Sequence, residues 1–157
     1  MKLSIDSEGD SSSGDFNPAK ATSVLEKELE ALYPASKNYE FAEISLSFVT
    51  PDEIKKLNRE YRNVDEPTDV LSFPLINFDE KENENFLMPV LALGDIVICP
   101  EEVSRLHPEL EKNEAIYLML AHSFLHLLGY DHDTEEKQAL MWRLQDEIKE
   151  KILAEAE

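Results

Sequence analysis

Several kinds of residue are scarce in this chain of 157 residues, and each scarcity excludes a class of protein. The single cysteine, Cys99, cannot form an intramolecular disulfide, which excludes a small secreted domain held together by disulfides. Basic residues number 15 against 34 acidic ones, and the net charge of −19 opposes nonspecific binding to DNA. The most apolar stretch, residues 117–130, contains two histidines and is shorter than the ~20 residues of a membrane-spanning helix. Because residues 1–15 also contain no apolar run typical of a signal peptide, we predict a cytoplasmic protein that binds neither DNA nor a membrane.

The length and the hydrophobic pattern predict one α+β domain over residues 1–157. Apolar residues make up 42% of the chain, which is enough for a single core. Helical spacing of apolar residues, with capping residues and prolines, predicts helices that begin near residues 18, 51, 100, 113 and 134. Alternating or continuous apolar segments predict strands at 44–48, 70–74 and 93–99. We expect a small mixed sheet of about four strands packed with about five helices, because strands and helices do not alternate regularly.

Two polar segments are predicted to be flexible loops. Residues 6–15 have no apolar side chain, so burial cannot offset the entropy that is lost when they become ordered. Residues 77–90 contain a run of acidic and amide side chains, a composition typical of solvated loops.

Three of the four histidines lie within eleven residues and form the most informative pattern in the sequence. His122 and His126 are four residues apart in a predicted helix, which places both imidazoles on one face within reach of one cation. Gly129 can adopt the left-handed conformation that ends a helix, so the chain can turn and bring His132 to the same point. Three protein ligands leave one position of a tetrahedral ion open for water, as in catalytic zinc sites. We therefore predict one Zn²⁺ per chain on a helix and the following turn, although Ni²⁺ and other transition metals also suit three imidazoles.

The histidine spacing also matches that of the metzincin proteases, with one important difference. Those enzymes have a glutamate after the first histidine as general base, and this chain has Ser123 there, a poor proton acceptor near neutral pH. Asp131 could orient a ligand imidazole, and Asp133 either does the same or caps the last helix, which we favour. The fourth histidine, His107, stands apart from the cluster and is predicted to be a surface or helix-capping residue.

Longer motifs in the chain resemble those of the YbeY family. The segment HSFLHLLGYDH at residues 122–132 is similar to the family signature H-G-x-L-H-L-x-G-Y-D-H, with Ser123 in place of the usual glycine. Residues 57–74 and 93–96 resemble two further stretches, so the resemblance covers residues 44–152 in order. It implies a metal-dependent, single-strand-specific endoribonuclease that acts in the maturation of small-subunit (16S) ribosomal RNA and in ribosome quality control. The implied partners are single-stranded rRNA and the small ribosomal subunit or its proteins and assembly factors.

The resemblance also implies roles for individual residues. In the family the three histidines His122, His126 and His132 bind the ion, and Arg62 matches an arginine that is important for catalysis. A side chain replaces the family's glycine at Ser123, and it could restrict how closely the substrate backbone approaches the metal, although serine is small.

Arg62 is the predicted catalytic residue outside the metal site. Its planar guanidinium suits the nonbridging oxygens of a phosphodiester under attack by a metal-activated water. Composition alone favours a salt bridge between Arg62 and Asp65 or Glu66 instead. Residues 51–62 carry four basic and three acidic side chains, a net +1, and the other residues total −20, so phosphate contacts are expected in this segment and at the metal. Three aromatic residues could stack on bases but are more typical of a core: Tyr61, Phe73 and Tyr130.

Two other functions are consistent with these residues. A metal-dependent peptidase or amidohydrolase would use the same metal geometry, but it needs the glutamate that Ser123 replaces. A nonenzymatic ribosome-assembly factor would hold a structural metal, whose fourth protein ligand would be Cys99, the one soft candidate.

Overall fold

The computed structural model describes residues 1–11, 16–76 and 88–155, and its elements occur in the predicted order with one further strand at the start. The strands are β1 (Lys2–Glu8), β2 (Tyr39–Phe48), β3 (Val70–Pro74) and β4 (Met88–Ile98). The α-helices are α1 (Pro18–Leu32), α2 (Pro51–Arg62), α3 (Pro100–Leu106), α4 (Lys112–Leu127) and α5 (Glu135–Ala154). A 3₁₀ turn, η1 (Pro34–Asn38), joins α1 to β2.

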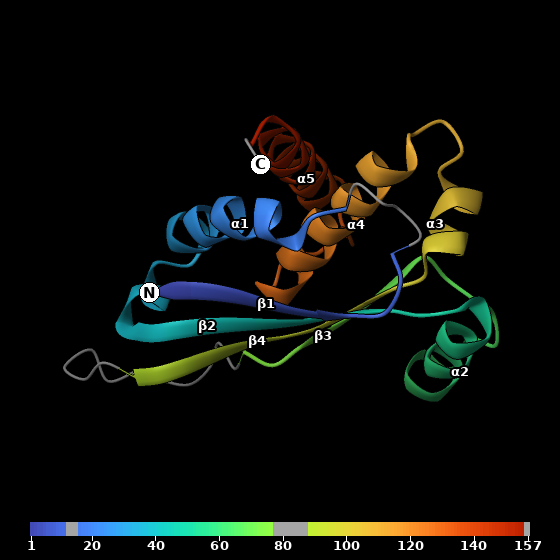
Figure 1. The fold of residues 1–157 in the computed structure, drawn as a ribbon, viewed down its shortest axis with the longest axis horizontal. Coiled ribbons are helices and arrows are strands. Elements are labelled where there is room, and N and C mark those ends of the chain that lie inside the picture. The colour runs from blue at the N-terminus through green and yellow to red at the C-terminus, as the bar shows by residue number, and fades with distance from the viewer. Residues whose placement is uncertain (12–15, 77–87, 156–157) are drawn as a thin grey trace.

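The strands form one mixed sheet in the order β1-β2-β4-β3. β1, β2 and β4 are parallel to one another, and β3 runs antiparallel to β4 at one edge. In Figure 1, α1, α4 and α5 lie over one face of this sheet, whereas α2 lies on the opposite side. The described residues thus confirm the predicted α+β domain of four strands and five α-helices.

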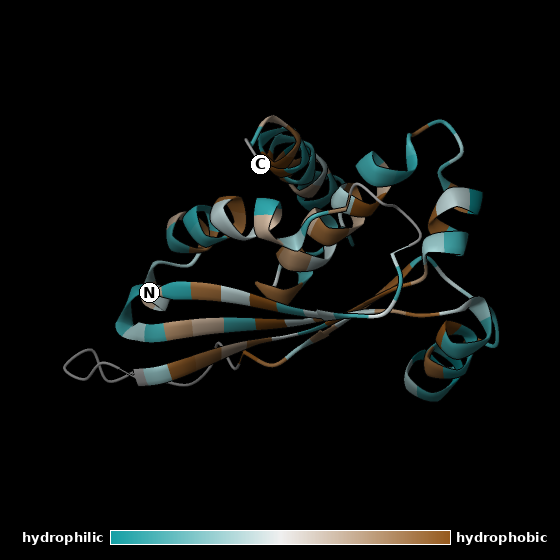
Figure 2. Ribbon diagram, in the orientation of Figure 1, coloured by the Kyte–Doolittle hydropathy of each residue, from teal (hydrophilic) through white to brown (hydrophobic). Residues whose placement is uncertain are grey.

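The main core lies between the sheet and the helices α1, α4 and α5. β2 contributes alternate residues to it, because Ala42, Ile44 and Leu46 are buried while Glu43 and Ser45 between them are exposed. α4 is buried on most sides by the sheet, α3 and α5, which explains why apolar residues dominate its sequence. Figure 2 shows hydrophobic residues concentrated on α4 and the strands, and mostly hydrophilic residues on α5. No helix in the part of the chain that the structure describes is long and apolar enough to cross a membrane.

A smaller apolar cluster holds α2 against the other face of the sheet. Ile54 of α2 is fully buried and packs in this cluster with Leu71 and Cys99. One turn further along the helix, Asn58 is 3% exposed and donates from Nδ2 to the carbonyl oxygen of Glu66 at 2.8 Å. This bond ties the loop after α2 back to the helix, and it thereby positions the C-terminal turn of α2 against the start of β3.

The helix starts follow the capping signals, with one correction. Asn17 and Thr50 cap α1 and α2 through their side-chain oxygens, as predicted. α5 is capped by Thr134, whose Oγ1 accepts from the backbone N–H of Lys137 at 3.2 Å. The preference for Asp133 as the cap was wrong, because Thr134 already satisfies the free N–H, and the Asp133 carboxylate lies 3.4 Å from Lys137 Nζ instead.

Parts of both predicted loops are strands. Residues 6–8 belong to β1, so the first loop prediction is wrong there. Their side chains are exposed at the sheet edge, and backbone pairing with β2, which side-chain polarity does not reveal, holds them in place. Residues 88–90 likewise begin β4, which pairs with β2. Residues 12–15 and 77–87 of the two predicted loops lie outside the described residues.

Candidate metal centre and its cleft

The three clustered histidines meet at one point, as the sequence predicts. His122 and His126 are one turn apart near the C-terminal end of α4. Gly129 follows the helix with φ of 93°, a left-handed conformation that favours glycine, and the chain turns there toward His132. One nitrogen from each imidazole lies within 4.8 Å of the others. Three nitrogen ligands therefore surround a position that one metal ion could occupy.

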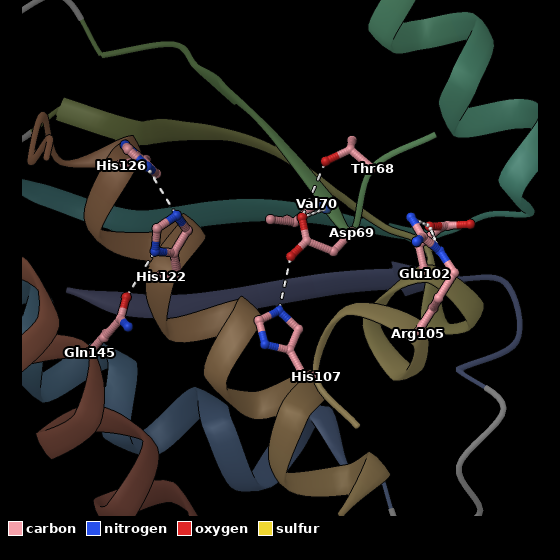
Figure 3. Close-up of polar contacts among 9 residues, drawn as sticks. All are labelled: Thr68, Asp69, Val70, Glu102, Arg105, His107, His122, His126 and Gln145. Atoms are coloured by element: carbon pink, nitrogen blue, oxygen red, sulfur yellow. Dashed lines mark hydrogen bonds and ion pairs between the residues drawn. The ribbon is translucent and has the colours of Figure 1, made fainter. Parts of the chain in front are cut away.

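Hydrogen bonds fix the orientation of two of the imidazoles. His126 Nδ1 lies 2.9 Å from the carbonyl oxygen of Tyr130, which can only accept, so Nδ1 carries the proton and Nε2 has the free lone pair. His122 Nδ1 lies 2.8 Å from Gln145 Oε1 on α5, which gives His122 the same tautomer (Figure 3). The two Nε2 atoms then face each other at 3.1 Å. Two lone pairs at this distance repel each other without a cation, so the arrangement suits a bound metal ion.

Burial keeps the same two imidazoles in the neutral form. It lowers the pKa of His122 below the usual 6.5, because a charged ring would lose its hydration. The pKa of His126 is also lowered, first by burial and then by the neighbouring His122. Neutral imidazole is the form that binds metals, so the donor set fits a transition metal ion.

α5 contributes two side chains beside the candidate metal centre that no motif in the sequence indicates. Gln145 holds His122 by the hydrogen bond described above. The ring of Trp142 lies 5.8 Å from that of His122 and 5.4 Å from that of His132, between ring centroids. Their spacing of three places Trp142 and Gln145 on one face of a helix, but nothing in the sequence shows that this face meets the histidines.

A cleft of about 730 Å³ lies beside the histidines. Its walls come from the end of α2, from β3 with the loop before it, and from the turn after α4. Arg62, the last residue of α2, lines this cleft and is exposed. Asp65 lies 3.8 Å from Arg59 instead, and Arg62 has no ion-pair partner among the described residues. Arg62 and the three histidines therefore share one cleft.

Comparison with known proteins identifies the family. The family described as "Endoribonuclease YbeY" matches residues 7–153. The chain belongs to the YbeY family.

Individual relatives agree with this assignment. A protein named Endoribonuclease YbeY from Thermoanaerobacter sp. (strain X514) is 41% identical over 133 residues, which cover 80% of this chain and 83% of that protein. Another of the same name, from Clostridioides difficile (strain 630), is 44% identical over 114 residues, which cover 70% and 71% of the two chains. The solution structure of a Thermotoga maritima protein matches 97% of this chain and 89% of its own, with a TM-score of 0.55 and 27% identity.

Membership in the YbeY family favours an RNA hydrolase over both alternative functions. The relatives give no support to a peptidase or amidohydrolase, nor to a nonenzymatic factor. A structural metal would also need a fourth protein ligand, but Cys99 is buried in the cluster under α2. Burial raises the pKa of its thiol, which disfavours the thiolate that binds metals. In the described part of the chain, the three histidines are the group of side chains that could hold a metal ion.

Ser123, where this YbeY family member differs from the usual glycine, faces the core and not the cleft. It is fully buried and is not part of the cleft wall. Successive residues of a helix point roughly 100° apart, so His122 reaches the cleft while Ser123 packs inward. The Ser123 side chain therefore does not stand between a substrate in the cleft and the histidines. Its hydroxyl has no hydrogen-bond partner among the described residues.

Two further residues have contacts that the sequence did not indicate. Asp131 accepts from the backbone N–H of His132 at 2.7 Å, a contact that orders the turn carrying this histidine. His107 caps the end of α3, as predicted, and its half-buried side chain also contacts a residue of the cleft. Its Nε2 lies 3.1 Å from the carboxylate of Asp69, which lines the cleft (Figure 3).

Proposed function

We propose that this member of the YbeY family is a single-strand-specific endoribonuclease that depends on one transition metal ion per chain. Its substrate would be small-subunit (16S) ribosomal RNA, and its role would lie in rRNA maturation and ribosome quality control in the cytoplasm. Zn²⁺ is the proposed ion, with Ni²⁺ as another that three imidazoles suit. The observation that carries the proposal is that His122, His126, His132 and Arg62 line the same cleft.

The residues around the metal position prepare it for an ion. When bound, the ion supplies Lewis-acid charge to a phosphate oxygen and increases the acidity of a water molecule. Gln145 and the carbonyl of Tyr130 keep Nδ1 of His122 and His126 protonated and direct both Nε2 atoms toward one point. Three protein ligands, without a fourth among the described residues, are typical of a catalytic site.

Arg62 would bind the phosphate that is cleaved. Its guanidinium is exposed in the cleft and has no acidic partner among the described residues, so its donors are available to a ligand. A planar guanidinium can bind two nonbridging oxygens, and a preorganised positive charge stabilises the charge that develops in the pentacoordinate transition state. Asn63, which ends α2 in the left-handed conformation with φ of 60°, places Arg62 on the last helical turn.

The charge distribution limits how RNA can reach this cleft. The net charge of −19 repels RNA from most of the surface, whereas α2 carries exposed basic side chains at Lys55, Lys56 and Arg59. Short single-stranded contacts near α2 fit this distribution better than a long duplex does. The small subunit, or one of its proteins or assembly factors, would therefore present the RNA.

Metal analysis and cleavage assays test this function. Protein purified without a nickel column should contain one transition metal ion per chain, and His126→Ala should lack it. Wild type should cut an unstructured RNA, should lose this activity on chelation, and should leave a perfect duplex and casein intact. An unchanged metal content in His126→Ala would overturn the three-histidine site. Casein cleavage that stops on chelation would favour the peptidase instead.

A further inference from the structure

The cleft contains an exposed aromatic side chain that the mechanism above does not use. Tyr61 is 65% exposed, although the apolar spacing of α2 predicts a buried residue. It lies in the last turn of α2, directly before Arg62, and both residues line the cleft. Large apolar side chains at the surface of a concave site often mark a binding surface. Tyr61 therefore needs a role other than core packing.

Phe73 of β3 supports the Tyr61 ring. The two ring centroids are 5.1 Å apart and the ring planes make an angle of 70°, which is the edge-to-face arrangement that aromatic pairs prefer. Phe73 is half-buried and packs on the apolar cluster under α2. The pair thus joins one ring anchored in the sheet to a second ring that is largely open to solvent. The Tyr61 hydroxyl has no hydrogen-bond partner in the described ranges, so contact with Phe73 is what orients it.

The surroundings of this pair suit a nucleobase. An aromatic face stacks on any of the four bases, and such stacking is sequence-tolerant. Arg62 next to Tyr61 offers a guanidinium for the phosphate of the same or the adjacent nucleotide. A base and its own phosphate are joined through one sugar, so two neighbouring side chains at a helix end can contact both. A peptide partner would not need the phosphate-binding guanidinium beside the ring.

We propose that Tyr61, supported by Phe73, forms a nucleobase-binding subsite that stacks on a base next to the phosphate bound by Arg62. This inference rests on the proposed ribonuclease function and adds a physical reason for single-strand preference. A base inside a duplex is already stacked and paired, so only an unpaired base can reach Tyr61 without the cost of leaving the helix.

RNA oligonucleotides with one abasic nucleotide test the subsite. The bond that wild type cuts in an unstructured RNA is mapped first, and the abasic nucleotide is then placed at each position near that bond. Tyr61→Phe should retain wild-type kcat/KM because it keeps the ring. Tyr61→Leu keeps apolar bulk but has no aromatic face, so its kcat/KM on intact RNA should fall at least about 10-fold. One abasic position should lower wild-type kcat/KM by a similar factor and abolish the difference between wild type and Tyr61→Leu.

Two controls separate stacking from a loss of fold. Phe41 is 47% exposed on β2 and is not part of the cleft wall, so Phe41→Leu should cut every RNA as wild type does. Metal content and Tm should be unchanged in Tyr61→Leu, which excludes damage to the histidine site.

The results distinguish failure of the subsite from failure of the function. If Tyr61→Leu cuts intact RNA like wild type, or loses the same factor on intact and on every abasic RNA, then Tyr61 does not stack on a base and the ribonuclease function stands. If wild type cuts none of the RNAs, the proposed function itself is wrong and the subsite is wrong with it.

Discussion

A substitution of Arg62 should change the rate of RNA cleavage without changing the stability of the protein. The side chain is exposed at the end of α2 and belongs to neither apolar cluster, so Arg62→Ala should retain the wild-type metal content and Tm. We expect cleavage of single-stranded RNA to fall by roughly 10²-fold at saturating RNA, because the proposed role of this charge is to stabilise the transition state. Steady-state kinetics measures this as a loss of kcat.

Arg59 is the matched control for Arg62. It lies one turn earlier and is 3.8 Å from Asp65, so Arg59→Ala should weaken the attraction of RNA to α2 without affecting kcat. That effect should disappear as salt rises, since exposed charges are screened. If Arg62→Ala matches wild type at saturation, its phosphate-stabilising role is wrong.

Ser123 carries a buried hydroxyl that the fold leaves without a partner in the described residues. Ser123→Ala removes this unsatisfied group and raises helix propensity, so urea unfolding should show a gain of about 1 kcal/mol. Ser123→Gly also removes the hydroxyl, but it should be about 1 kcal/mol less stable than the alanine variant. Neither change should alter ribonuclease activity, because the side chain does not line the cleft. Loss of stability in Ser123→Ala would mean that the hydroxyl has a hydrogen bond in solution.

At the scale of elements, the contact between α4 and α5 fixes the orientation of His122 in the candidate metal centre. Gln145→Leu retains similar bulk but removes the acceptor that fixes His122, so metal affinity should fall about 10- to 100-fold with the fold retained. Trp142, the only tryptophan in the chain, lies beside two of the histidines and provides a fluorescence signal for metal titration. Gln138→Leu changes the same residue type at an exposed position of α5 and should bind metal normally. Equal affinity in Gln145→Leu and wild type would exclude an orienting role for Gln145.

How well an element could be predicted depends on how local its signal is. The start of α2 is predicted by Thr50 and the residues of the first turn after it. The candidate ligands from His122 to His132 are predicted by their spacing along one helix and the glycine turn that ends it. β1 was missed because its residues 6–8 are held by pairing with a strand far away in the chain. Gln145 was missed for the same reason, since its contact with His122 spans 23 residues. Tyr61 shows the limit of periodicity, because helical spacing predicts burial and the cleft leaves the ring exposed.

At the scale of the whole molecule, the sheet separates the two helices that supply His122, His126 and Arg62 to the cleft. α4 lies on one face of the sheet and α2 on the other (Figure 1). Residues from the ends of both helices line the cleft together with β3. His122 and His126 therefore come from the largely buried helix α4, and Arg62 comes from α2, which carries four basic and three acidic side chains. The acidic remainder, within a total of −19, repels phosphate, which would favour the approach of RNA at α2 over the rest of the surface.

The stability of the whole molecule should depend on pH through the buried histidines. The folded protein lowers the pKa of His122 and His126 below 6.5, whereas in the unfolded chain both have their ordinary value. Well above pH 6.5 both states are neutral at these positions. As the pH falls further, the unfolded chain takes up protons that the folded protein does not, so stability decreases. Between pH 7 and 5 the Tm of metal-free wild type should therefore fall relative to that of His126→Gln. The glutamine side chain of this variant does not titrate, so only His122 of the two histidines contributes to its pH dependence.

Metal binding should make the same pH dependence steeper. An ion held by the three histidines would join α4 to the turn at His132, so metal-loaded protein should melt at a higher temperature than chelated protein near pH 7.5. Protons compete with the ion for the imidazoles, and we expect this gain in Tm to vanish toward about pH 5. Differential scanning calorimetry of loaded and chelated protein across this range measures the gain directly. A gain as large at pH 5 as at pH 7.5 would place the ion on carboxylates, which stay ionised at pH 5, and would contradict the three-histidine site.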